Sequence, residues 1–123
     1  MKYLMIVLGG GAGSLSRYLV GAAIVTRYGT RFPIVGTMSI NITGSFLIGL
    51  LMTLFTERFS ANANLRPLLV IGFLGGYTTF SSFEWETYSA IREGGLWAAI
   101  CNVAGSVTFG YAAVWLGAML ARR

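Results

Sequence analysis

The sequence has 123 residues, of which 55% are hydrophobic and 17 are glycine, and its formal net charge is +5. This composition is unlike that of a soluble domain and typical of packed membrane helices. We therefore interpret the basic residues as lipid headgroup contacts rather than as a nucleic-acid surface. With a single Cys101 and no histidine, the chain excludes an intrachain disulfide, a zinc site and histidine-based catalysis.

Four apolar stretches are each long enough to cross a hydrocarbon core of about 30 Å. They cover residues 3–25, 33–56, 67–91 and 96–120 and are joined by short connections. We therefore predict one all-α transmembrane domain of four spans over residues 1–123. A cleaved signal peptide is the alternative for the first stretch. Its apolar core YLMIVL is short, however, and the hydrophobic pattern resumes at YLVGAAIV.

The first span contains GGGAGSLSRY, whose small residues would allow a neighbouring helix to approach closely. Arg17 lies within this span, where a charge costs about 2.5–3.5 kcal/mol on insertion scales. It should therefore face protein or extend to an interface. The sequence leaves three roles open: an interfacial anchor, a partner of helix-end carbonyls, or an anion ligand.

The second span begins at Pro33, which suits the first turn of a helix. Among its polar residues are Thr37, Asn41 and Thr43. The amide of Asn41 lies at midspan and must find a partner. An interhelical hydrogen bond and a contact with a transported substrate are both compatible with this position.

The third span contains GFLGGYTTFSSFEWETYS, residues 72–89. Its GGYTT segment combines adjacent glycines with adjacent threonines, which weaken a helix and compete for its backbone groups. We predict that the helix breaks here, with a simple kink as the alternative. A break inside a membrane exposes carbonyls that bind cations and N–H groups that favour anions.

Phe80 and Phe83 follow the break and lie one turn apart on one face. The edge of an aromatic ring is electropositive, so these rings suit contact with a small anion; core packing is the alternative. Thr79 and Ser82 would supply hydroxyl donors beside them. Glu84 is expected at the water boundary, and the role of Glu86 is left open.

The fourth span places Asn102, Ser106 and Gly110 at intervals of four residues, on one helix face. This face is either a polar track or a close packing seam.

The distribution of basic residues predicts orientation only weakly. Both insertion orientations with antiparallel pairing, and a single orientation with the N-terminus inside, remain compatible with it. Five basic residues fall on one side of four spans and three on the other: Lys2, Arg58, Arg66, Arg122 and Arg123 against Arg27, Arg31 and Arg92.

Three motifs, GGGAGSLSRY, GTMSINITGSFLIG and GFLGGYTTFSSF, occur in this order on a four-span chain. With them the sequence resembles the Fluc (CrcB) family of small bacterial fluoride channels over essentially its whole length. The resemblance implies a fluoride-selective channel, not an enzyme, that passively exports fluoride across the bacterial inner membrane. It also implies an antiparallel, dual-topology homodimer with two pores, each lined by both subunits.

The resemblance further implies roles for individual residues. A structural sodium ion at the dimer centre would be held by the backbone carbonyls of Gly75 and Thr78 from both subunits. Arg17 matches an arginine of the family without a role being implied, and Asn102 and Gly110 stand where the family can have tyrosine and serine. The implied pore residues are the amide of Asn41, the Phe box of Phe80 and Phe83, the hydroxyls of Thr79, Ser82 and Ser106, and the carboxylate of Glu86.

Two other functions are compatible with a small four-span chain. A proton-coupled multidrug exporter would need an acidic residue in the first span, which has Arg17 and no acid; Glu84 and Glu86 would have to serve instead. A non-transporting assembly subunit would leave Asn41, GGYTT and the phenylalanine pair unexplained.

Overall fold

The computed structural model describes residues 1–29, 33–57 and 64–123, and the described residues are helical apart from short links. Arg31 and Arg58, which entered the prediction of orientation, lie outside these ranges. The predicted all-α fold is confirmed. The helical elements are α1 (Lys2–Tyr28), α2 (Pro33–Glu57), η1 (Pro67–Leu74), α3 (Gly75–Tyr77), α4 (Phe80–Arg92) and α5 (Leu96–Ala121).

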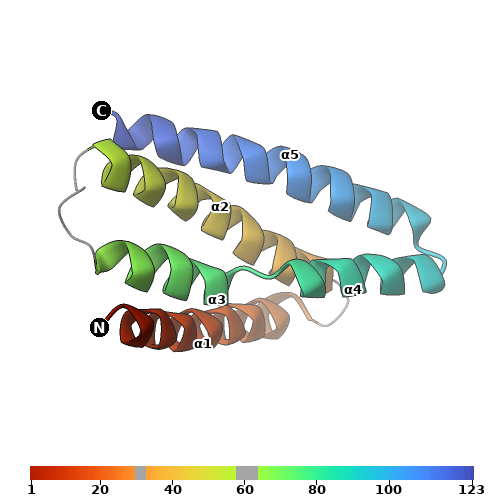
Figure 1. Ribbon diagram of the computed structural model, residues 1–123. Helices are drawn as coiled ribbons and strands as arrows, with labels where there is room; N and C mark the ends of the chain where they lie inside the picture. The colour runs from red at the N-terminus through yellow and green to blue at the C-terminus, as the bar shows by residue number, and fades with distance from the viewer. Residues whose placement is uncertain (30–32, 58–63) are drawn as a thin grey trace.

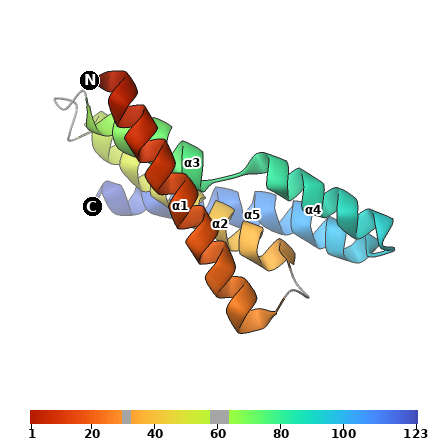
Figure 2. The same ribbon diagram turned by 90° about the horizontal axis from the view of Figure 1, so that it is seen from below.

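The elements form a bundle in which both termini lie at the same end (Figure 1). The helix α1 packs against η1 and α3, whereas α2 packs mainly against α5. Beyond α3 the chain leaves α1, and α4 runs beside α5 (Figure 2). The turn between α4 and α5 contains Gly94 at a φ of 80°, a conformation that favours glycine.

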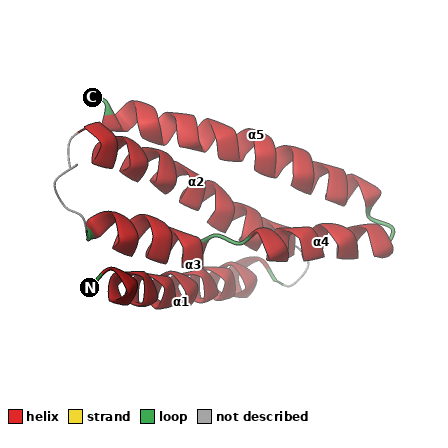
Figure 3. Ribbon diagram, viewed as in Figure 1, coloured by secondary structure: helices red, strands yellow, loops and turns green. Residues whose placement is uncertain are grey.

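Within the described residues, three helices are long and apolar enough to cross a membrane: Lys2–Tyr28, Ile34–Glu57 and Leu96–Ala121. The third predicted span does not form one continuous helix of this kind. It is divided into η1, α3 and α4, with an extended link between α3 and α4 (Figure 3). Its first part is a π-helix, a rare form found often at functional sites, which the sequence did not predict.

The break itself lies at Thr78 and Thr79, which have extended backbone conformations with ψ of 155° and 117°. The break therefore falls within GGYTT, as predicted, but the glycines do not form it. Gly75 is helical, with φ of −63° and ψ of −35°, and a Cβ on Gly76 would overlap the backbone of Gly10. Gly76 is thus required for the close approach of α1 rather than for the break.

Glycines also allow α1 to approach η1 at backbone distance. A Cβ on Gly9 would overlap the carbonyl of Leu68, and a Cβ on Gly13 would overlap the carbonyl of Phe73. Such contacts between small residues are a main source of helix association in membranes, because lipid supplies no hydrophobic driving force.

Replacing Gly9 with alanine should therefore destabilise the bundle. The new methyl group meets backbone atoms that cannot rotate away, and overpacking of this kind costs about 1–3 kcal/mol. The yield of monodisperse protein in detergent and its thermal midpoint would measure the loss. Gly11→Ala is the matched control, since a Cβ there meets nothing within 4 Å. Equal stability of the two variants would contradict the packing of α1 against η1.

Candidate functional site

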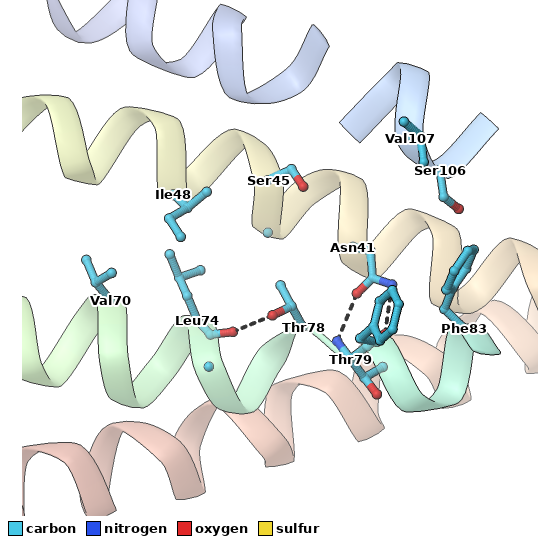
Figure 4. A pocket seen from close by; sticks show the side chains of 13 residues that line it. Asn41, Ser45, Ile48, Val70, Leu74, Thr78, Thr79, Phe83, Ser106 and Val107 are labelled. Atoms are coloured by element: carbon cyan, nitrogen blue, oxygen red, sulfur yellow. Dashed lines mark hydrogen bonds between the residues drawn. The ribbon is translucent and has the colours of Figure 1, made fainter. Parts of the chain in front are cut away.

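The helix break opens onto a groove with a cavity volume of about 420 Å³ (Figure 4). It lies between α2, the broken third span and α5. None of the described residues that line it carries a charge. These residues are Asn41, Gly44, Ser45, Ile48, Val70, Leu74, Gly75, Thr78, Thr79, Phe80, Phe83, Ser106 and Val107.

Asn41 on α2 holds the break by two hydrogen bonds to Thr79. Its Nδ2 donates to the Thr79 carbonyl at 3.0 Å, and its Oδ1 accepts from the Thr79 N–H at 2.9 Å. The side chain thus satisfies the Thr79 N–H, which the interrupted helix leaves without a partner, and adds a bond to the carbonyl of the α4 N-cap. The second hydrogen of the Asn41 amide is not used in these bonds, and Asn41 lines the groove.

The two hydrogen bonds between Asn41 and Thr79 form a clamp that changes the partners of the nearby carbonyls. In a continuous α-helix the Thr79 N–H would donate to the carbonyl of Gly75, but here it donates to Asn41. Arg17 NH1 donates to the Thr78 carbonyl at 3.2 Å. Of the three roles left open for Arg17, the structure therefore supports a partner of helix-end carbonyls.

The hydroxyl of Thr79 caps α4. It accepts from the N–H of Ser82 at 3.3 Å and donates to the Ser82 hydroxyl at 3.1 Å, as an N-cap threonine does. The proton of the Ser82 hydroxyl remains available to another acceptor. The cap fixes the first turn of α4, from which both phenylalanines of the predicted pair project.

Phe80 and Phe83 lie against each other, with ring centroids 5.6 Å apart and an angle of 38° between the rings. Both line the groove, but their environments differ. Phe83 is buried, with 9% of its surface exposed, whereas Phe80 is 73% exposed in the single chain. A large aromatic ring at the centre of a span is therefore left without a partner on most of its surface.

Thr37 and Glu86 lie apart from the groove, on the facing part of α2 and the more distant part of α4, and the predicted Ser82 is also not one of the lining residues. The hydroxyl of Thr37 donates to Glu86 Oε1 at 2.6 Å. The other carboxyl oxygen, Oε2, is buried and has no hydrogen-bond partner among the residues that the structure describes. Glu84 is exposed.

The three residues predicted to share one face of α5 lie in two different environments. Ser106 lines the groove, whereas Asn102 and Gly110 are buried. A Cβ on Gly110 would lie 3.6 Å from Ser45 Oγ on α2, so this position is part of a packing seam. The structure thus places seven predicted residues together around the groove: Asn41, Gly75, Thr78, Thr79, Phe80, Phe83 and Ser106.

Two further hydroxyl residues, one in the groove lining and one bonded to Asn102, were not predicted from the sequence. Ser45 lines the groove, and its spacing of four residues from Asn41 on α2 was the available signal. Thr87 accepts a hydrogen bond from Asn102 at 2.9 Å. Its signal was weaker, because only the spacing from Phe83 related it to the site.

The comparison with known sequences identifies the family. A model described as CrcB-like protein, Camphor Resistance (CrcB), matches residues 4–118. The chain belongs to the CrcB family. It is 68% identical over 123 residues to the Fluoride-specific ion channel FluC of Solibacter usitatus, with each chain covered completely.

Two further CrcB relatives carry the same name. The protein of Acidobacterium capsulatum is 46% identical over 123 residues, which are 100% of this chain and 98% of the relative. A protein of Coxiella burnetii is 48% identical over 124 residues, with 100% and 99% coverage. These similarities extend over the whole length of the chain. Together with the apolar helices, membership of the CrcB family makes this chain a membrane protein.

Proposed function

We infer that this CrcB-family chain is a fluoride-selective ion channel that lets fluoride leave the cytoplasm down its electrochemical gradient and so reduces fluoride toxicity. The observation that carries this function is the groove at the break. It combines an amide, hydroxyls and aromatic rings with no fixed charge among its described lining residues.

The chemistry of the groove suits a small, strongly hydrated anion. A selective path must replace the hydration water of fluoride with other donors, and the groove offers the Asn41 amide, the Ser106 hydroxyl and the ring edges of Phe80 and Phe83. Conduction also requires that no position retain the ion too tightly. The Arg17 guanidinium donates to the Thr78 carbonyl, and Arg17 is outside the groove lining.

The channel is proposed to be an antiparallel homodimer in the bacterial inner membrane, with two pores. In a single chain, the groove is open at its side and Phe80 is 73% exposed. Polar groups at this depth are unfavourable against lipid, so a second copy would supply the missing wall. The nearly balanced basic residues on the two sides of the chain are compatible with insertion in both orientations.

A structural sodium ion at the centre of this dimer fits the residues present. The Asn41 clamp diverts the Thr79 N–H and so leaves the Gly75 carbonyl available. The Thr78 carbonyl accepts from Arg17 but has a second lone pair. Carbonyls of unwound membrane helices are suitable sodium ligands. Gly75 and Thr78 of both subunits would hold the ion, which would stabilise the two breaks against each other.

Purified protein in liposomes should release fluoride rapidly when a potassium gradient and valinomycin supply the balancing current. A fluoride electrode records the release, and chloride-loaded liposomes are the control. We expect release that depends on valinomycin, with chloride retained, because channel transport of an anion moves net charge. Absence of fluoride release from well-folded dimers would refute the proposed function and favour an exporter or an assembly role.

A further inference from the structure

We propose that Asn102 is a positioning residue of the pore, which acts through Thr87 to set the distance between the Phe83 ring and the Ser106 hydroxyl. This inference rests on the proposed fluoride channel and assigns to Asn102 a role other than contact with the ion.

The burial of Asn102 argues against a direct role in the ion path. Its side chain is 1% exposed, although the groove is open in the single chain. Asn102 and Thr87 both belong to the described part of the chain, and neither lines the groove. An anion travelling along the groove would therefore have to displace protein to reach the Asn102 amide.

The hydrogen bonds of Asn102 connect two pore elements instead. Its Nδ2 donates to Thr87 Oγ1 at 2.9 Å, and the Thr87 hydroxyl donates to the Phe83 carbonyl at 2.8 Å. Because Thr87 and Phe83 are on successive turns of α4, the amide of Asn102 ties α5 to the helical turn that carries the Phe83 ring. An interhelical hydrogen bond in a membrane has little competition from water.

The same amide reaches the other side of the groove. The Ser106 hydroxyl donates to Asn102 Oδ1 at 3.4 Å, which is long for an O–H···O bond. Ser106 points from α5 toward the part of the groove where Phe83 lies (Figure 4). The weak bond would let the Ser106 proton turn to an anion, while the shorter bonds keep α4 in place. Asn102 thus couples the positions of the Phe83 ring on α4 and the Ser106 hydroxyl on α5, both of which line the groove.

A positioning role predicts a loss of selectivity and not only of activity. When the link between α4 and α5 is removed, the Phe83–Ser106 distance is no longer held, and the larger chloride ion is admitted. Thr87→Val removes the linking hydroxyl with little change in shape and leaves every groove residue intact. Asn102→Leu removes the amide, and the double variant removes both.

The experiment measures valinomycin-dependent fluoride and chloride release from liposomes that contain equal amounts of folded dimer. Thr87→Val and Asn102→Leu should each lower the fluoride/chloride rate ratio about three- to tenfold, within the range expected for one interhelical hydrogen bond in a membrane. The double variant should be no worse than the more affected single variant, because both changes break the same link. Thr108→Val, at an exposed position of α5, is the matched control and should retain the wild-type ratio.

Other results would overturn this role. If Thr87→Val keeps the wild-type ratio, Asn102 does not act through Thr87, whatever Asn102→Leu does. Additive losses in the double variant would likewise assign the two residues to separate functions. A lower yield of folded dimer with an unchanged fluoride/chloride rate ratio would show that the Asn102–Thr87 bond contributes only to packing. Failure of the wild-type protein to release fluoride would instead refute the proposed channel, so the two failures are distinguishable.

Discussion

Replacing Asn41 with aspartate should reduce fluoride release by about 100-fold or more. The change has two effects at once. A carboxylate oxygen would face the Thr79 carbonyl, to which the Asn41 amide now donates at 3.0 Å, and a negative charge would enter a groove whose described lining has none. Two like charges 4 Å apart repel by about 4 kcal/mol at an effective dielectric constant near 20, which is ample for a loss of this size.

The measurement is the rate of valinomycin-dependent fluoride release per folded dimer. Asn64→Asp makes the same chemical change at an exposed position before η1, and this control should release fluoride at the wild-type rate. A wild-type rate in the Asn41→Asp variant would remove Asn41 from the pore and leave it only the structural role at the break.

Replacing Phe80 with isoleucine should lower fluoride release at least about tenfold, equivalent to ~1.4 kcal/mol in the barrier. Isoleucine keeps the hydrophobic character of the side chain but has no electropositive ring edge to contact the anion. Because Phe80 is 73% exposed in the single chain, little packing within one chain is lost. Isoleucine also keeps apolar the surface that a second subunit would cover, so the yield of dimer on size-exclusion chromatography should change much less than the release rate.

Phe83→Ile should also depress release, but Phe83 is buried and its replacement also removes packing. Phe80 is therefore the cleaner test of the aromatic pair. Phe109→Ile is the matched control, since Phe109 is 59% exposed on α5 and is not one of the groove-lining residues. Normal fluoride release from both Phe80→Ile and Phe83→Ile would show that the two rings contribute only to packing and do not contact the anion.

Gly75 and Gly76, the glycines of GGYTT, show that helix propensity alone did not predict how this segment folds. Adjacent glycines weaken a helix, and this property correctly directed attention to GGYTT. In the structure, however, the extended residues are Thr78 and Thr79, while Gly76 lies against the backbone of Gly10. Helix propensity measures only the cost within one segment. Whether a glycine serves a break or a close contact depends on the neighbouring helix.

Asn41 and Arg17 show the same limit for polar residues. The sequence established that both must be satisfied, because polar groups inside a membrane are costly when unpaired. It did not identify their partners as Thr79 and Thr78, which are 38 and 61 residues away. The π-helical form of η1 was missed as well, since the hydrophobic pattern of an apolar span does not distinguish one helix type from another.

By itself, the sequence determined the four apolar segments, the region of the helix break and the kinds of side chain available to an anion. These properties follow from composition and from the spacing of residues close together in the chain. Only the tertiary structure decided that Asn41 clamps the break, that Arg17 takes the Thr78 carbonyl, and that Asn102 is withdrawn from the groove toward Thr87. The physical reason is that a hydrogen bond is defined by distance and direction, and between distant segments these are set by helix packing.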